Sequence, residues 1–298
     1  MELSLCCISN ILAEEGTKFR KITYKSFSSL SKEEGFKKIS EISLHNLDVT
    51  LKTLKLCFKL NIKGYRMSSD IFPLLTHPDI NIKMNNLPCW NYIEEKITEI
   101  SKYIIESKIR VSAHPSEYIT LTSDNESSIK NSIADLELHA EIFDRLNLPC
   151  NYYSPLNIHI RKDGDCENLY NSFITNFNKL SNSVKKRLVL ENNDNKNGTW
   201  SIKKLVNVFH KRENIPITFD NLHHHFLSDE LEEKDAFEMA YNTWNCQPLF
   251  HYSESRDGTK AHAEMPNNIP NHYGKNVMFD VELKGKDAAI LQLIKKIH

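Results

Sequence analysis

Histidine and carboxylate side chains recur at the ends of short apolar segments of this chain, each closing or closely following a run such as Leu188–Glu191. The set is His114, His159, Glu191, Asp220, His223, His251, His262 and Glu282. Imidazole nitrogens and carboxylate oxygens together suit divalent Mn, Zn or Fe, and one carboxylate can bridge two ions. Eight ligands are too many for one ion. The set therefore predicts a cluster of two or three divalent metal ions that activates water and neutralises a phosphate.

Three members of this set are our candidates for catalysis, namely Glu191, His114 and Asp220. Glu191 stands in the middle of the series along the chain and is the best candidate to bridge two ions. A single histidine at a strand end is more often a hydrogen-bonded structural residue, so the prediction depends on recurrence at successive ends. Because the side chains of His223, His224 and His225 are adjacent and point apart, we expect at least one of them to be structural.

The elements that must position these residues are short β-type segments that alternate with longer amphipathic segments. The expected strands are 3–8, 64–67, 109–114, 156–160, 187–191, 215–220, 249–252 and 276–283. The expected helices are 32–60, 91–107, 127–146, 168–180, 201–211, 229–241 and 287–297. In the first helix the apolar residues recur every three to five positions, which is the stripe of an amphipathic helix. This alternation predicts an α/β fold, a single (β/α)8 TIM barrel that spans residues 1–298.

An open, doubly wound sheet is the rival fold, and the sequence disfavours it. The chain contains no G-x-G-x-x-G or G-x-x-x-x-G-K-[ST] loop that could hold a nucleotide, so we expect no nucleotide cofactor. In a barrel, the carboxyl ends of all strands meet at one rim, where enzymes of this fold place their active sites. The candidate residues would then converge from distant parts of the chain.

Composition excludes several classes of protein. The 298 residues are 40% hydrophobic and 26% charged, which is typical of a folded chain and not of a disordered one. Lys+Arg 38 against Asp+Glu 39 gives a net charge of -1, which excludes a globally basic nucleic-acid binder but allows a local basic face. No apolar stretch approaches the roughly 18 residues that span a bilayer, and the start does not resemble an export signal, so we expect no membrane partner. Seven cysteines without a C-x-x-C pair indicate reduced thiols and a cytoplasmic protein.

Basic and aromatic residues near the same strand ends could contact nucleic acid. The basic residues are Arg161, Lys162, Lys284 and Lys286, and the aromatic residue is Tyr118. Each cation could bind a phosphate, and solvated surface charge is an equally good interpretation of each. Tyr118 could stack on a base or could simply cover the rim.

Short motifs surround the candidate residues over nearly the whole chain. They are Tyr65–Ser69 with Pro73 and Thr76–Pro78, Ser112–Pro115, Asn157–Ile160, Leu190–Asn193, Asp220–His224, Phe250–Ser253, Ala261–Ala263 and Glu282–Lys286. In order and spacing these motifs resemble the UV damage endonuclease family, a TIM-barrel group related to AP endonuclease IV and to sugar-isomerase barrels.

The resemblance implies a DNA-repair endonuclease that nicks damaged double-stranded DNA on the 5′ side of UV photoproducts, such as cyclobutane pyrimidine dimers and 6-4 photoproducts. It implies a manganese-type cluster of three ions, with Zn²⁺ or Mg²⁺ as alternatives, and all eight residues of the set as ligands. It places Asn10 at the position of a site asparagine near the first strand. It places Glu117 and Tyr118 where the family inserts a probing pair at the lesion.

Three departures from the family pattern bear on the site. The residue before the probing aromatic is usually glutamine, whereas here it is Glu117. Leu249 stands where some members carry a carboxylated lysine as an extra ligand, so one metal position could be weaker. Asp70 stands where other members have histidine or serine, and it could add a ligand, donate a proton or cap the following segment.

Two other classes of function remain open. A sugar isomerase or epimerase of the xylose-isomerase-like class uses a similar rim of histidines and carboxylates. Nucleic-acid contacts by Tyr118 and by the basic residues separate the two enzymes, since a sugar does not require them. A lesion-binding protein without catalysis is disfavoured because it does not require eight ligand-type side chains.

Overall fold

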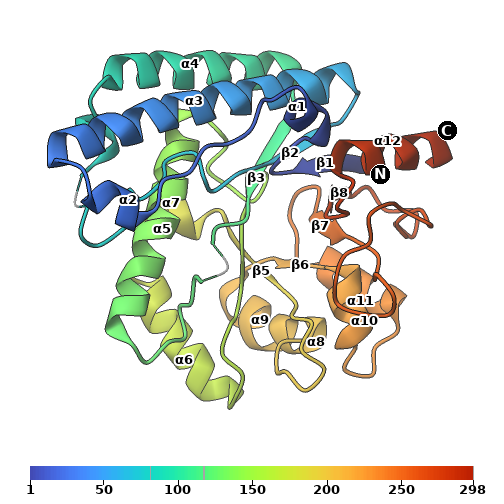
Figure 1. Cartoon of the computed structure of the whole chain (residues 1–298). Helices are drawn as coiled ribbons and strands as arrows, with labels where there is room; N and C mark the ends of the chain where they lie inside the picture. The colour runs from blue at the N-terminus through green and yellow to red at the C-terminus, as the bar shows by residue number, and fades with distance from the viewer. Residues whose placement is uncertain (81, 117, 298) are drawn as a thin grey trace.

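The computed structural model of the protein describes residues 1–80, 82–116 and 118–297. In this part of the chain, eight parallel strands form one sheet with the order β6-β5-β4-β3-β2-β1-β8-β7 (Figure 1). The strands are β1 (Glu2–Cys6), β2 (Gly64–Met67), β3 (Arg110–Ala113), β4 (Leu156–His159), β5 (Leu188–Glu191), β6 (Ile217–Thr218), β7 (Leu249–Tyr252) and β8 (Met278–Val281). All eight lie within or overlap the expected strands.

The first and last strands of this order meet at a narrow seam. β6 and β7 are joined by a single parallel bridge between Asp220 and His251, and the His251 N–H donates to the carbonyl of Phe219 at 2.9 Å. The sheet is therefore a nearly closed barrel, which confirms the TIM-barrel prediction and excludes the open doubly wound sheet. The seam is built from two of the candidate ligands.

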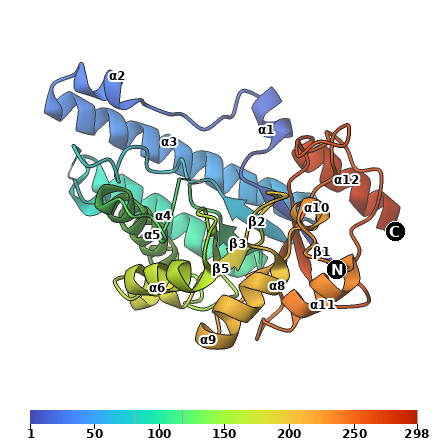
Figure 2. The same cartoon turned by 90° about the horizontal axis from the view of Figure 1, so that it is seen from below.

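Helices follow the strands and surround the barrel, as Figures 1 and 2 show. Those on the first half of the chain are α1 (Asn10–Glu14), α2 (Tyr24–Ser28), α3 (Lys32–Lys59), η1 (Met84–Asn86), α4 (Trp90–Ser107) and α5 (Glu126–Arg145). Those on the second half are α6 (Cys166–Phe177), α7 (Asn182–Lys185), α8 (Ile202–Leu205), η2 (Val206–His210), α9 (Lys211–Glu213), α10 (Asn221–Phe226), α11 (Glu233–Tyr241) and α12 (Lys286–Ile297). None of the described helices is long and apolar enough to cross a membrane.

The long helices were predicted more accurately than the short ones. The expected helix 32–60 is α3, which begins with a capping box between Ser31 and Glu34. The expected helix 201–211 is a continuous run of α8, the π-helical turn η2 and α9. The sequence analysis missed α1, α2, α7 and α10, because helices of four to six residues have too few turns to show an apolar period.

Polar residues close the amino-terminal end of the barrel interior. The guanidinium of Arg110 is buried and donates to the carbonyls of Tyr153 at 2.7 Å and Gln247 at 2.8 Å. Beside it, Gly64 pairs with Ser4 across the β1–β2 ladder. A Cβ atom at Gly64 would lie 2.6 Å from both the Met278 Sδ and the Ser4 Cβ. Only glycine leaves room for these neighbours.

We therefore expect Gly64→Ala to lower the free energy of unfolding by about 1–3 kcal/mol, the usual cost of overpacking. The measurement is chemical denaturation followed by circular dichroism. As a control, Met278→Ala removes the clashing Sδ atom, so the double variant should lose less stability than the sum of the two single variants. Wild-type stability of Gly64→Ala would contradict this packing.

Candidate metal centre

Glu191 lies at the centre of the cluster and is only 1% exposed. Four imidazoles surround its carboxylate. One oxygen is 3.2 Å from His114 Nε2, 3.5 Å from His159 Nε2 and 3.2 Å from His251 Nδ1, and the other oxygen is 3.2 Å from His223 Nδ1. This convergence brings together residues that are up to 137 positions apart in the chain, as the strand-end pattern predicted.

Within this cluster, three groups of possible ligand atoms overlap, because neighbouring groups have one residue in common. They are His114, His159 and Glu191; Glu191, Asp220 and His223; and Asp220, His251 and Glu282. In each group the candidate atoms all lie within 4.8 Å of one another. The groups overlap at Glu191 and Asp220, so two carboxylates lie where they could each bridge neighbouring ions. Seven of the eight predicted ligands are in these groups.

His262 lies at the edge of the cluster. Its Nε2 is 3.8 Å from Glu282 Oε2, while its Nδ1 lies 2.9 Å from the backbone carbonyl of Glu282. The second contact fixes the ring, and it leaves Nε2 directed towards the Glu282 carboxylate. His262 thus neighbours the third group without belonging to it.

The donor atoms in the cluster suit divalent cations. Asp220 Oδ2 is buried and has no hydrogen-bond partner among the described residues, and His251 Nδ1 lies against the carboxylates of Glu191 and Glu282. Buried polar atoms are nearly always paired, so the unpaired Asp220 oxygen among other ligand-type atoms indicates a ligand. Nitrogen and carboxylate donors in this mixture are those that Mn²⁺, Zn²⁺ and Fe²⁺ accept.

Burial and charge set the protonation of the cluster. Burial opposes the charge of Glu191, but the surrounding histidines outweigh it and hold the pKa of this carboxyl well below its usual range. Burial lowers the pKa of His159 to about 4, although Glu191 counteracts it, so this imidazole is neutral and able to bind a metal. Burial also disfavours the charged form of His251, yet Glu191 and Glu282 raise its pKa to about 9. A metal ion would therefore bind His251 in competition with a proton.

Parallel register explains how the strands bring these residues together. His159 pairs with Glu191 across β4 and β5, and Glu191 pairs with Thr218 of β6. His251 pairs with Asp280 across β7 and β8. Since side chains alternate along a strand, residues in register on neighbouring strands point to the same side of the sheet. The barrel interior is that side.

Helix α10 positions His223 and separates it from its neighbours. The Asp220 carboxylate caps the helix by accepting the His223 N–H at 2.7 Å. His224 is buried against the Phe219 ring, and His225 is exposed. Of the three adjacent histidines, only His223 enters the described cluster, because a helix turns successive side chains by about 100°.

Three polar residues that the sequence analysis did not single out support the cluster, of which Asn157 and Asp280 are buried and Arg66 is largely buried. Arg66 forms ion pairs with Glu282 and, at 3.9 Å, with Asp280. Asp280 Oδ2 lies 3.7 Å from His251 Nε2, and the Asn157 amide donates to Glu191. The available signal was the period of two, since Asn157 precedes His159 and Asp280 precedes Glu282 by two positions.

Asp70 lies outside the three groups. Its carboxylate forms an ion pair with Lys21 at 2.9 Å, and its N–H donates to the Ser68 hydroxyl at 3.2 Å. These contacts give Asp70 a structural part in the segment after β2, which was one of the interpretations that the sequence left open.

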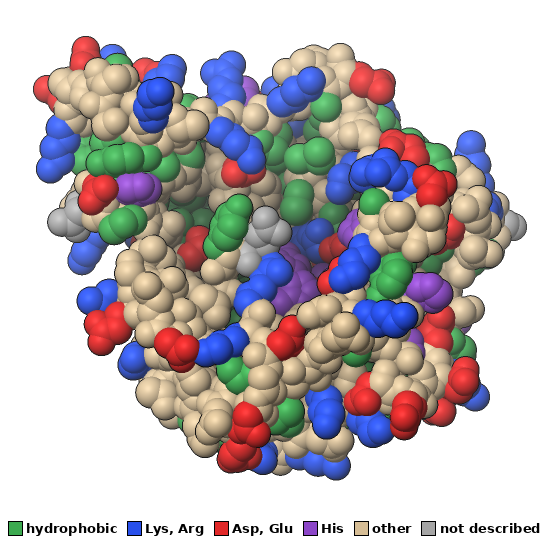
Figure 3. Space-filling view, turned by 60° about the horizontal axis from the view of Figure 1, so that its bottom comes forward, with side chains coloured by type: hydrophobic (Ala, Val, Ile, Leu, Met, Phe, Trp, Pro, Cys, Tyr) green, Lys and Arg blue, Asp and Glu red, His purple; other side chains and the backbone are tan. Residues whose placement is uncertain are grey.

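The residues predicted to contact DNA are spread along the rim. Tyr118 is 83% exposed, and Arg161 and Lys284 are also exposed. Lys162 forms an ion pair with Asp124, and Lys286 is half-buried. The Asn10 amide donates to the carbonyl of Lys284 at 3.1 Å and so ties α1 to the loop after β8. Glu117 lies outside the described residues. In Figure 3, histidines form the floor of a hollow, with Lys and Arg side chains around it.

Helix α5 holds the loop that carries Tyr118. The Ser116 N–H donates to Asp135 at 3.3 Å, and the Thr120 N–H donates to the Ser132 hydroxyl at 2.9 Å. These hydrogen bonds hold Ser116 and Thr120, which lie two positions before and two positions after the exposed tyrosine.

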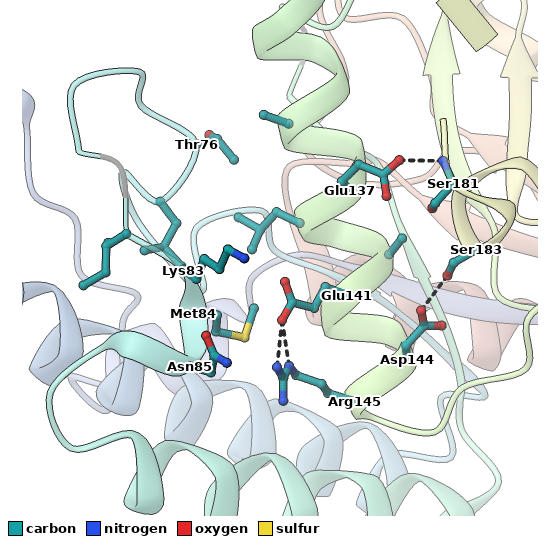
Figure 4. A pocket seen from close by; sticks show the side chains of 15 residues that line it. Thr76, Lys83, Met84, Asn85, Glu137, Glu141, Asp144, Arg145, Ser181 and Ser183 are labelled. Carbon is teal, nitrogen blue, oxygen red and sulfur yellow. Dashed lines mark hydrogen bonds and ion pairs between the residues drawn. The ribbon is translucent and has the colours of Figure 1, made fainter. Parts of the chain in front are cut away.

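A groove of about 870 Å³ lies outside the barrel between α5 and residues 75, 76 and 82–85 (Figure 4). Its carboxylates already have partners. Glu137 accepts the Ser181 N–H, Glu141 accepts the Arg145 guanidinium, and Asp144 accepts the Ser183 hydroxyl. This groove is therefore not a second metal centre.

The family model described as UV-endonuclease UvdE matches residues 1–298. A protein named UV DNA damage endonuclease, from Nostoc sp., is 32% identical over 98% of this chain and 89% of its own length. The crystal structure of SacUVDE superposes with a TM-score of 0.84 at 28% identity, over 100% of this chain and 98% of its own. A D-tagatose 3-epimerase-like protein has a TM-score of 0.55 at 13% identity, over 80% and 88% of the two chains, and shares the fold alone.

We expect Mn²⁺ to raise the melting temperature of the chelator-treated protein. An ion at 100 times its Kd stabilises the folded state by about 2.7 kcal/mol, or roughly 5 °C for a chain of this size. Glu191→Gln should lose most of this shift because two ligand groups share Glu191. Asp70→Asn is the matched control and should keep the shift. A full shift in Glu191→Gln would exclude the proposed centre.

Proposed function

The chain belongs to the UV-endonuclease UvdE family, and from this premise we propose that it incises damaged double-stranded DNA on the 5′ side of UV photoproducts in a reaction that requires divalent metal ions. The substrates are cyclobutane pyrimidine dimers, 6-4 photoproducts and other helix-distorting lesions. The observation that carries the proposal is the buried Glu191 carboxylate among four imidazoles at the carboxyl ends of the strands.

The ligands in this proposal are His114, His159, Glu191, Asp220, His223, His251, His262 and Glu282. Two or three Mn²⁺ ions are the proposed occupants, with Zn²⁺ or Mg²⁺ as alternatives. Bound there, such ions polarise a phosphodiester and lower the pKa of water, which is the chemistry that metal ions supply in phosphoryl transfer. The buried Asp220 Oδ2, which has no hydrogen-bond partner among the described residues, supports this assignment.

The protein's own groups have separate tasks in this reaction. Glu191, His114 and Asp220 are the proposed catalytic residues, because Glu191 and Asp220 each belong to two ligand groups and His114 contacts Glu191. Asn157 holds the Glu191 carboxylate, and Arg66 neutralises part of the negative charge of Glu282. The cluster therefore keeps a fixed arrangement before the phosphodiester arrives, and such preorganisation lowers the cost of reaching the transition state.

DNA is held by the rim in this proposal. Arg161, Lys162, Lys284 and Lys286 contact phosphates on either side of the lesion, and Asn10 lines the site near β1. Tyr118, with Glu117 before it, enters the gap that a damaged base pair leaves, because a damaged pair costs less to open than a sound one. The exposure of Tyr118 and its anchored loop support this role.

Sugar epimerisation is the weaker alternative. The epimerase-like relative shares the fold at 13% identity, and fold alone does not carry function. Binding of a small sugar does not require an exposed tyrosine at the rim.

We further propose that residues 1–298 form one catalytic domain. It works in the compartment that holds the genome, which is the cytoplasm in a bacterial cell.

We expect the purified protein to nick a duplex with one cyclobutane dimer on the 5′ side of that lesion. Excess EDTA should abolish the nicking, and Mn²⁺ added beyond the chelator should restore it, because the cluster supplies the only proposed route to an activated water. The measurement is gel separation of end-labelled strands, with the undamaged duplex as control. Undiminished cleavage in excess EDTA would overturn the proposal.

We expect Tyr118→Ala to weaken binding to the damaged duplex roughly tenfold, since an aromatic side chain in an unstacked gap contributes about 1–3 kcal/mol. Bound metal should stay at the wild-type level, because Tyr118 lies outside the ligand groups. Fluorescence anisotropy and metal analysis provide the two measurements. Tyr92→Ala, an equally large change at an exposed position on α4, is the control. Wild-type affinity of Tyr118→Ala, or loss of its metal, would contradict the probing role.

A further inference from the structure

Residues 17–25 run from the segment after α1 into the first turn of α2 and form a strap on the same rim as the cluster. Lys18, Phe19 and Lys21 of the strap line a cleft of about 400 Å³ together with Ile8, which follows β1, and Asp70, which follows β2. In Figure 1 the strap crosses in front of α3 between the two short helices, and Figure 2 shows it running along one side of α3. The strap therefore borders the side of the site formed by β1 and β2.

A buried amide on α3 fixes the backbone of the strap. Asn46 is fully buried, accepts the Arg20 N–H at 2.8 Å and donates to the Arg20 carbonyl at 3.0 Å. The same amide donates to the Asp70 carbonyl at 2.7 Å, and His45 Nε2 lies 2.9 Å from the Lys18 carbonyl. The strap is thus joined both to α3 and to the segment that follows β2.

The strap presents positive charge to solvent. Lys18, Arg20, Lys21 and Lys25 are exposed, and residues 16–31 contain no aspartate or glutamate. Phe19 and Ile22 pack against the core between them. In Figure 3, Lys and Arg side chains lie along the upper edge of the hollow that holds the histidines. A fixed backbone, half-buried apolar anchors and exposed cations together suit a polyanion.

The ion pair that Lys21 forms leaves the positive charge of the strap available to bind phosphate. Lys21 pairs with Asp70, but the two side chains are 71% and 38% exposed. Ion pairs of this kind contribute little to stability, so phosphates can replace the carboxylate at small cost. Lys18 and Arg20 form no ion pair among the described residues.

We propose that the strap binds the phosphate backbone of the duplex beyond the scissile position, on one arm only. The inference rests on the proposed function, because it assumes that the duplex lies across the histidine-lined hollow. Arg66 of β2 contacts Glu282 of the cluster, and Asp70, which contacts the strap, lies four residues after Arg66. A duplex positioned over the cluster and extended past β2 meets Lys18, Arg20 and Lys21 next.

The test is a variant with Lys18→Ala, Arg20→Ala and Lys21→Ala. The matched control is Lys59→Ala, Lys63→Ala and Lys186→Ala, which removes equal charge from exposed positions just before β2 and β5, at the opposite end of the barrel. Binding is measured by anisotropy at several salt concentrations. The duplexes carry one dimer and are extended either on the 5′ arm or on the 3′ arm.

Each phosphate contact contributes about 0.9 to the slope of log K against log salt, so the strap variant should lose about 2–3 units of slope. The loss should occur for one extended arm only, and the control should match the wild type. Incision at saturating enzyme should stay within about threefold of wild type, since the strap lies outside the ligand groups. Arg20→Ala alone, which breaks none of the ion pairs among the described residues, should lose about one unit of slope if the triple variant folds poorly.

The same duplexes separate the two proposals. If the wild type incises them but the strap variant keeps the wild-type slope, or loses slope equally on both arms, the strap proposal is wrong and the proposed function stands. If the wild type does not incise the dimer with Mn²⁺ present, the proposed function is wrong, whatever the slopes are.

Discussion

The buried charge of Glu191 is the constraint on which the rest of the barrel depends. A carboxylate moved out of water is very costly unless charged or hydrogen-bonding groups surround it. Here those groups come from β3, β4, α10 and β7, so the carboxylate is compensated only when the strands close around it. Closure itself uses the cluster, because the β6–β7 seam is the bridge between Asp220 and His251. The contacts that complete the fold are therefore largely those that assemble the site.

A second set of charges makes this arrangement specific. Arg66 places a buried cation between Glu282 and Asp280, and Asp280 in turn faces the far nitrogen of His251. Buried ion pairs add little net stability, but removing one partner leaves an uncompensated charge. The network thus permits few alternative orientations of Glu282 and His251. Outer partners of this kind orient the ligands of metal sites and adjust their affinity.

The sequence identified candidate ligands where the type of a residue and its place at the end of an apolar run were enough to suggest them. The strand-end histidines and carboxylates were found because the residue type and the end of an apolar run coincide at His159 and Glu191. Asn157 and Asp280 were missed because a polar residue inside a short strand faces the interior or the solvent according to register, which pairing with other strands decides. Asp70 was ambiguous for a similar reason, since its partner Lys21 is 49 positions away in a segment without a regular pattern. The packing of distant segments cannot be deduced from either segment alone.

Two segments at the rim are anchored through hydrogen bonds to their backbone groups, which leaves their side chains free to vary. The loop with Tyr118 is held by Asp135 and Ser132 of α5, and the strap is held by Asn46 of α3. In both cases the anchoring side chain binds backbone groups of the loop, which every residue except proline can offer in full. Side chains in the loops can then change without losing their place above the cluster. Catalysis needs one fixed arrangement of ligands, whereas recognition of DNA needs adaptable groups, and anchoring through the backbone lets one barrel provide both.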